Sequence, residues 1–190
     1  MTLHVFNPEH DIALAYDNKY FTAPHAGRQL RNDLDYLPVL WAAEGDYVLV
    51  ENVSSAQQHA LRLQRYGKQV QFIDKNDVER LSEQIDHVMP WGWDSSVKFQ
   101  LGQLGVKESL LPEDKTLVDI RQLSNRQFSS AVLRDVQKEL SNPILLGKAT
   151  YIDSIVELES VLQRIGKAVI KAPWSSSGRG VRYVDFVLDA

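Results

Sequence analysis

The stretch ELESVLQRIGKAVIKAPWSSSGRGV, residues Glu157–Val181, changes its pattern several times in quick succession. Apolar residues first recur at helical spacing and stop at Gly166, a residue typical of helix ends. The apolar run AVIKAPW then predicts a strand, and serines and glycines follow before VRYVDF resumes an extended pattern. The stretch therefore predicts a helix, a strand, a loop of small residues and a second strand.

The loop between these two strands carries groups that suit a phosphate. Its backbone N–H groups and hydroxyls are good donors to phosphate oxygens, and glycine lets a ligand approach the backbone closely. Lys171 precedes the loop and Arg179 lies in it, and both supply positive charge. A hairpin loop without a ligand is the alternative interpretation. The small residues of the loop are Ser175, Ser176, Ser177, Gly178 and Gly180.

The loop matches neither of two common nucleotide-binding motifs. A Walker loop needs G-x-x-x-x-G-K-[ST] at the start of a helix, and a dinucleotide fingerprint needs G-x-G-x-x-G. Neither pattern occurs in the sequence. A phosphate site at this loop would therefore belong to another class of nucleotide-binding protein.

Composition limits the class of protein further. The chain has 190 residues, enough for one large domain or two small ones, and 44% of them are hydrophobic. The absence of cysteine excludes disulfides and thiolate metal sites. The sequence has no apolar run of membrane-spanning length and its N-terminus does not resemble a signal peptide, so we expect a cytoplasmic protein that does not bind membranes.

Charge is unevenly distributed along the chain. The net charge is −4, with an acidic balance over residues 1–115 and a slightly basic one over residues 116–190. A protein that grips long nucleic acid needs a concentrated basic surface, which this distribution does not provide. We therefore expect a small-molecule substrate and no nucleic-acid partner, and the sequence leaves the oligomeric state open.

Residues 1–115 alternate between strand and helix patterns. Strands are predicted at residues 3–6, 47–51, 69–73 and 87–91. Helical patterns lie between them at residues 28–43, where Pro38 should kink or end the helix, at 54–66 from a Ser54 capping box, and at 77–85. This alternation predicts an α/β domain with a mostly parallel sheet.

The pattern breaks at residues 112–116, and we place a domain boundary there. The two predicted domains are residues 1–115 and 116–190. In the second, Ser124 and Gln127 form a capping-box pattern before a helix that ends at Asn142-Pro143. Ser154 and Glu157 begin the helix that leads into the strand and loop described above.

This order of helix, strand, Lys171-x-Pro173, glycine-rich loop and strand resembles the ATP-grasp superfamily. The resemblance covers residue 123 to the end of the sequence, and residues 1–115 are similar to the Rossmann-like domain that precedes the grasp. It implies that Lys171 contacts ATP phosphates and that residues 175–180 form a flap over them. Members usually hold a second lysine at the start of an earlier helix, and Arg126 occupies that position here. The segment NPEHDIALA is similar to an uncharacterised ATP-grasp-like group.

The resemblance also implies an activity. An intact ATP-grasp ligase uses Mg-ATP to convert a carboxylate into an acyl phosphate, which an amine or similar nucleophile then attacks. The superfamily holds its Mg²⁺ ligands and much of its adenine site in a second half that would follow Ala190. We therefore expect this chain to be the truncated N-terminal portion of such an enzyme, to bind ATP, to supply no metal ligands and to be inactive alone. A non-catalytic module that binds a nucleotide or another phosphate ligand is the alternative.

The N-terminal domain carries further candidates for substrate binding. Glu9, His10 and Asp11 follow the first predicted strand directly. Ligands of open α/β sheets bind at the carboxyl ends of strands, so these residues are substrate candidates, and an enzyme acting through them is a third hypothesis. Capping of the next helix is the alternative interpretation, because acidic residues at a helix start need no other reason.

Two tryptophans and two arginines are also candidates either for ligand binding or for a structural role. Trp91 and Trp93 flank a glycine after the fourth predicted strand, where they would wall a pocket or pack at an interface. Arg28 and Arg31 would bind a carboxylate or phosphate, or belong to a solvated helix start.

Overall fold

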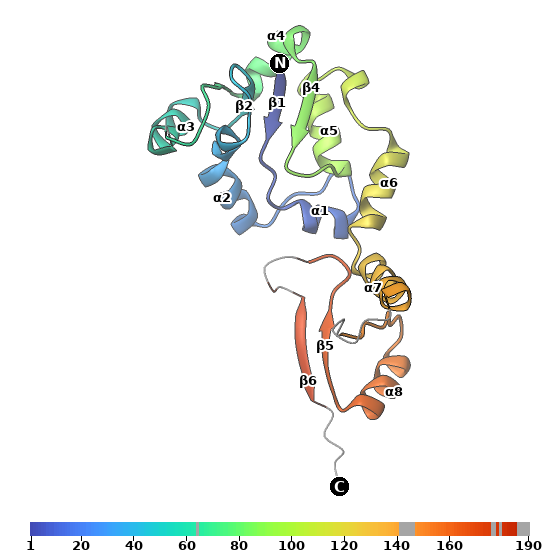
Figure 1. Ribbon diagram of the computed structural model, residues 1–190. Coiled ribbons are helices and arrows are strands. Elements are labelled where there is room, and N and C mark those ends of the chain that lie inside the picture. Colours follow the sequence, from blue (N-terminus) through green and yellow to red (C-terminus); the bar gives the residue numbers. More distant parts are fainter. Residues whose placement is uncertain (64, 141–146, 176–177, 179, 186–190) are drawn as a thin grey trace. The chain divides into compact units, whose positions relative to one another are not determined.

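The computed structural model describes residues 1–63, 65–140, 147–175, 178 and 180–185 (Figure 1). The chain divides into two compact units, Met1–Ile120 and Arg121–Ala190. The division lies within helix α6 (Asp114–Leu123), which the sequence analysis did not anticipate. The boundary predicted between residues 115 and 116 falls in the first turn of this helix.

The first unit is built on a four-stranded parallel sheet. Its strands are β1 (Thr2–Val5), β2 (Tyr47–Leu49), β3 (Gln71–Ile73) and β4 (His87–Pro90). They lie in the order β3-β2-β1-β4, and Leu3 is aligned with Tyr47 on one side and with Val88 on the other. The predicted α/β class and parallel sheet are confirmed.

The strand order creates a switch point beside β1. The chain leaves β1 for β2 and β3 on one side and returns to β4 on the other side. In doubly wound α/β folds this reversal leaves a crevice at the carboxyl ends of the strands, where ligands bind. Here the reversal falls between β1 and β4, which are followed by Asn7 and Trp91-Gly92.

Helices connect the strands of the first unit. They are α1 (His10–Tyr16), α2 (His25–Leu34), α3 (Val53–Ala60), α4 (Lys75–Leu81) and α5 (Ser95–Gln103), with short 3-10 turns at Leu37–Leu40, Leu61–Leu63, Ser82–Gln84 and Glu108–Leu110. The helical pattern predicted around Pro38 is divided, as expected, into α2 and a 3-10 turn that contains the proline.

Both faces of the sheet are covered. One face, which includes Leu3 and Val88, packs against apolar residues of α4 and α5 such as Val78 and Leu101. The opposite face presents Val48 to Ala56 of α3. The central strands β1 and β2 are buried on both faces, whereas the edge strands β3 and β4 keep exposed residues such as Gln71 and Met89.

Side-chain caps begin several of these helices. Asp74 and Asp77 form a reciprocal capping box on α4, and the Asp94 carboxylate accepts from the backbone N–H groups of the first turn of α5. On α3 the cap is Asn52, whose side chain accepts from Ser55 N at 2.9 Å. The prediction of a Ser54 cap was wrong, because the helix begins two residues earlier in the chain than that pattern requires.

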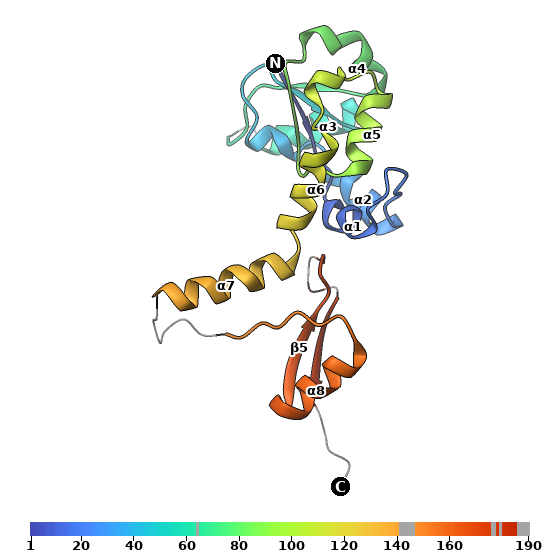
Figure 2. The ribbon, with the colours of Figure 1, turned by 90° about the vertical axis from the view of Figure 1, so that its right-hand side faces the viewer.

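Two helices and a β-hairpin follow α6 in the described residues of the second unit. They are α7 (Arg126–Leu140), α8 (Ile155–Ile165), β5 (Lys167–Lys171) and the antiparallel β6 (Val181–Asp185). Ser154 caps α8, and Gly166 ends it with a φ of 75°, as predicted. Helix α8 lies along the hairpin (Figure 2). None of the helices in the described part of the chain is long and apolar enough to cross a lipid bilayer.

Candidate functional site

The glycine-rich loop joins the two strands of the hairpin in the second unit. Its ends are held together by Ala172 N, which donates to Gly180 O at 2.8 Å. Gly178 and Gly180 both have a φ of 73°, a conformation that glycine adopts without steric cost. A Cβ on Gly180 would also lie 2.9 Å from Ala172 Cβ and 3.2 Å from Ser175 Cβ. The loop therefore needs glycine at position 180 for both reasons.

Arg126 attaches the start of α7 to the first half of this loop. Its guanidinium donates to the carbonyl oxygens of Ala172 at 3.2 Å and Ser175 at 2.9 Å. Its backbone N–H donates to Pro173 O at 3.0 Å. Two fixed acceptors suit the planar fork of arginine, which a lysine could not reproduce. The structure thus brings Arg126 to the loop with which the ATP-grasp resemblance grouped it.

Trp174 anchors the same segment from the other side. Its indole N–H donates to Arg121 O at 3.0 Å, and the Arg121 guanidinium lies 4.2 Å from the ring centroid. Such stacking of an arginine on tryptophan is attractive. The backbone of residues 172–175 is therefore fixed by contacts from two positions near the start of the unit.

The donors around the loop fit a phosphate group. Lys171 ends β5 with an exposed side chain and has no ion-pair partner within the described residues. The Ser175 hydroxyl is buried and has no hydrogen-bond partner in the same part of the chain. Ser176, Ser177 and Arg179 lie outside the described residues, so their predicted role stays a prediction.

No group of three His, Cys, Asp or Glu side chains is arranged to hold a metal ion in the regions that the structure describes. The donors at the hairpin loop can bind phosphate oxygens, but they are not carboxylate ligands.

At the switch point of the first unit, Asn7 and Gly92 bind each other reciprocally. The Asn7 amide donates to Gly92 O at 2.8 Å and accepts from Gly92 N at 3.2 Å. Asn7 is 1% exposed, so these bonds are sheltered from water. They join the carboxyl ends of β1 and β4 through groups that lie far apart in the sequence.

Asp94 extends this connection to α1 and α5. One carboxylate oxygen lies 3.2 Å from His10 Nδ1, and the other accepts from Ser96 N and Val97 N, both at 2.9 Å. Burial alone would raise the pKa of Asp94, but the hydrogen bonds from these three residues outweigh it and lower the pKa. His10, a predicted substrate residue, is thus engaged in a structural bond to a helix cap.

The other predicted substrate residues are distributed around the same edge. Glu9 is buried and forms an ion pair with Arg31 of α2, and Asp11 lies in the first turn of α1. Trp93 packs against the main core. Trp91 is exposed, with its ring against those of Phe6 and Trp41 at centroid distances of 5.7 and 5.9 Å. The structure thus brings Glu9 together with Arg31, while neither tryptophan lines the cavity described next.

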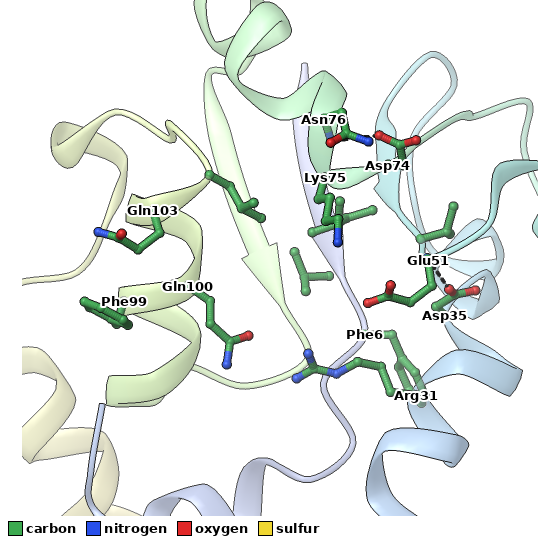
Figure 3. Close-up of a pocket in the computed structure, with 14 residues that line it drawn as sticks. Phe6, Arg31, Asp35, Glu51, Asp74, Lys75, Asn76, Phe99, Gln100 and Gln103 are labelled. Atoms are coloured by element: carbon green, nitrogen blue, oxygen red, sulfur yellow. Dashed lines mark hydrogen bonds between the residues drawn. The ribbon is translucent and has the colours of Figure 1, made fainter. Parts of the chain in front are cut away.

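A cavity of about 420 Å³ opens at the carboxyl ends of β1, β2 and β3 (Figure 3). A second cavity of about 280 Å³ shares Arg31, Glu51 and Gln100 with it and includes Glu9. The larger one has an apolar floor and a mixed set of charged and amide side chains. It is lined by Val5, Phe6, Arg31, Asp35, Leu49, Val50, Glu51, Asp74, Lys75, Asn76, Phe99, Gln100, Gln103 and Leu104.

Asp35 lies in the wall of this cavity, and its pKa is raised. Its carboxylate accepts from Glu51 N at 2.7 Å, which ties the end of α2 to the segment after β2. Burial raises the pKa of Asp35 from 3.8 to about 6, and the nearby Glu51 charge acts in the same direction. A carboxyl group that changes its charge near neutral pH therefore borders the cavity.

Sequence reasoning considered Arg31 but missed Asp35, Glu51, Lys75 and Gln100. A signal for two of them was present, because Glu51 follows β2 and Lys75 comes shortly after β3, and carboxyl ends of strands are where ligands bind. Gln100 and Asp35 have no such signal, since only the packing of their helices brings them to this edge.

Comparisons of this chain with protein-family models, with curated proteins and with solved structures found no match. The functional argument therefore depends on the two sites themselves.

The close approach of His10 to Gly92 gives a first prediction. A Cβ on Gly92 would lie 2.3–2.5 Å from atoms of the His10 ring. Gly92 is not among the glycines with positive φ, so the cost of Gly92→Ala is this clash. We expect the substitution to lower the free energy of unfolding by about 1–3 kcal/mol, measured by urea denaturation.

A double-mutant cycle provides the control. His10→Ala removes the ring that the new Cβ would meet, so Gly92→Ala should cost much less in that background. Equal costs in both backgrounds would show that the clash is not the cause.

The raised pKa of Asp35 gives a second prediction. Between pH 4 and 6 the folded state holds a proton on Asp35 that the unfolded state has released, so this residue lowers stability as the pH rises. Asp35→Asn keeps an acceptor for Glu51 N and removes the titration. At pH 7 we expect the variant to be more stable than the wild type by about 1–3 kcal/mol, and at pH 4 equally stable. Urea denaturation at pH 4 and pH 7 measures the free energy of unfolding of both proteins. If the variant and the wild type differed by the same amount at both pH values, the raised pKa of Asp35 would be contradicted.

Proposed function

We propose that this chain is the N-terminal portion of an ATP-grasp ligase-like protein and that its hairpin loop binds the phosphates of ATP. The observation that carries the proposal is the position of Arg126. It lies at the start of α7, and its guanidinium hydrogen-bonds to the loop at Ser175, 49 residues away in the sequence. Members of the superfamily that the sequence resembles usually hold a lysine at the start of an earlier helix, and Arg126 occupies that position here.

The loop has the chemistry for this ligand. Lys171 ends the strand that enters the loop. The Ser175 hydroxyl, which has no partner among the described residues, and the glycine backbone offer further donors. Charge-assisted hydrogen bonds contribute about 1.5–3 kcal/mol each. Arg126 uses two carbonyl acceptors to fix the loop, so part of its role is to hold the donors in place and part is to add positive charge.

When bound, ATP would supply the phosphoryl group that activates a carboxylate in the intact enzyme. The residues of this chain would bind and orient the phosphates and balance their charge. The Mg²⁺ ligands would come from the second half of the grasp, which the resemblance places after the present sequence. We therefore expect the 190-residue chain to bind ATP through its loop.

Titration calorimetry with ATP tests the proposal on the full 190-residue chain. Lys171→Gln should weaken ATP binding about tenfold or more, because one charge-assisted hydrogen bond is lost. Lys167→Gln is the matched control, since Lys167 begins the same strand with an exposed side chain and lies away from the loop.

The outcomes separate the proposal from its alternatives. Equal ATP affinity of the wild type and both variants would contradict phosphate binding at the loop. Inorganic triphosphate that binds as tightly as ATP would instead favour a module that recognises phosphate alone.

A further inference from the structure

We propose that the larger cavity of the first unit binds a small zwitterion of amino-acid size, through its carboxylate and its ammonium group. This site lies entirely within Met1–Ile120 and does not depend on the hairpin loop. The inference goes beyond the proposed ATP binding, which concerns the second unit alone.

Opposite charges face the cavity without pairing with each other. Lys75 is the first residue of α4 and Glu51 follows β2, so separate elements hold them. Figure 3 shows both side chains directed into the space above Phe6. Neither has a hydrogen-bond or ion-pair partner through its side chain within the described residues. Both residues are exposed to solvent, and a ligand that carries both charges can form a charge-assisted hydrogen bond with each.

Arg31 adds donors on the far side of the same space. Its ion pair with the buried Glu9 holds the guanidinium in place and balances its charge. Its Nε atom is buried without a partner in the described part of the chain, as is the second carboxylate oxygen of Glu9. The Gln100 amide points toward Arg31 (Figure 3). Arg31 is therefore a fixed hydrogen-bond donor whose charge also interacts with that of Glu51, and Lys75 supplies a second positive charge at the cavity.

The floor of the cavity is apolar, and the wall also holds the polar residues Asp35, Asp74, Asn76 and Gln103. Val5, Leu49 and Leu104 lie against the cavity, and a volume of about 420 Å³ is at the lower end of the range for small-molecule sites. A single amino acid fits this size better than a nucleotide with its phosphates. The chemistry assigns the ligand carboxylate to Lys75 with help from Gln100, the ammonium group to Glu51, and the side chain to the apolar floor.

The test is a titration of the full chain with each of the twenty standard L-amino acids, followed by two-dimensional NMR without ATP. We expect at least one to bind and to shift the amide signals of residues around the cavity. Its N-acetyl derivative and its carboxamide should each bind at least tenfold more weakly, because each lacks one of the two charges. Absence of binding by all twenty, or equal binding of the blocked derivatives, would overturn the proposal.

Two variants identify the anchors separately. Glu51→Gln should weaken binding of the amino acid at least tenfold and leave that of the N-acetyl derivative unchanged, because that derivative carries no ammonium group. Lys75→Gln should weaken binding of the amino acid and of the N-acetyl derivative and leave that of the carboxamide unchanged. Glu44→Gln and Lys68→Gln are the controls, since both residues are exposed and neither lines the cavity.

These outcomes are independent of the hairpin loop. Glu51→Gln and Lys75→Gln should not alter ATP affinity, whereas Lys171→Gln should not alter amino-acid affinity. The assignment would also be contradicted if Glu44→Gln and Lys68→Gln weakened binding of the amino acid as much as Glu51→Gln and Lys75→Gln do.

Discussion

The reciprocal hydrogen bonds between Asn7 and Gly92 are the constraint on which the carboxyl edge of the first unit depends. They join the ends of β1 and β4 at the point where the strand order reverses. Asp94 then connects this junction to His10 of α1 and to the start of α5. Because Asn7 and Asp94 are buried, loss of either would leave polar groups without water or partner. The walls of the cavity, which include α5, are held in place through this junction.

Charges at this edge fall into two groups. Asp94 and Glu9 each meet a basic side chain, and such pairing compensates for burial. Asp35 instead meets the backbone N–H of Glu51 and lies near the Glu51 carboxylate, so its ionised form is disfavoured. Lys75 and Glu51 remain available to a ligand. The edge thus combines paired carboxylates, Asp94 and Glu9, with Asp35, whose charge depends on pH, and with two charged side chains that a ligand can reach.

Much of the fold could be predicted from local pattern, and the site only in part. Apolar runs identified the central strands because both of their faces are buried, and Ser154 with Gly166 marked both ends of α8. Helix α6 was missed because Leu117 is its one buried residue among those described. The association of Arg126 with the loop was anticipated through family resemblance. The cavity was not, because Glu51, Lys75 and Arg31 meet only after three separate connections have packed.

The junction at Asn7 also determines when the first unit can form. Asn7 and Gly92 are 85 residues apart, so the bond closes a long loop of chain and forms only after its entropic cost has been met by other contacts. During synthesis Asn7 leaves the ribosome well before its partner exists. Strands β1, β2 and β3 can pair in that interval, whereas the edge that carries the cavity must wait for β4 and the start of α5. The candidate binding site is therefore among the last parts of the unit to be assembled.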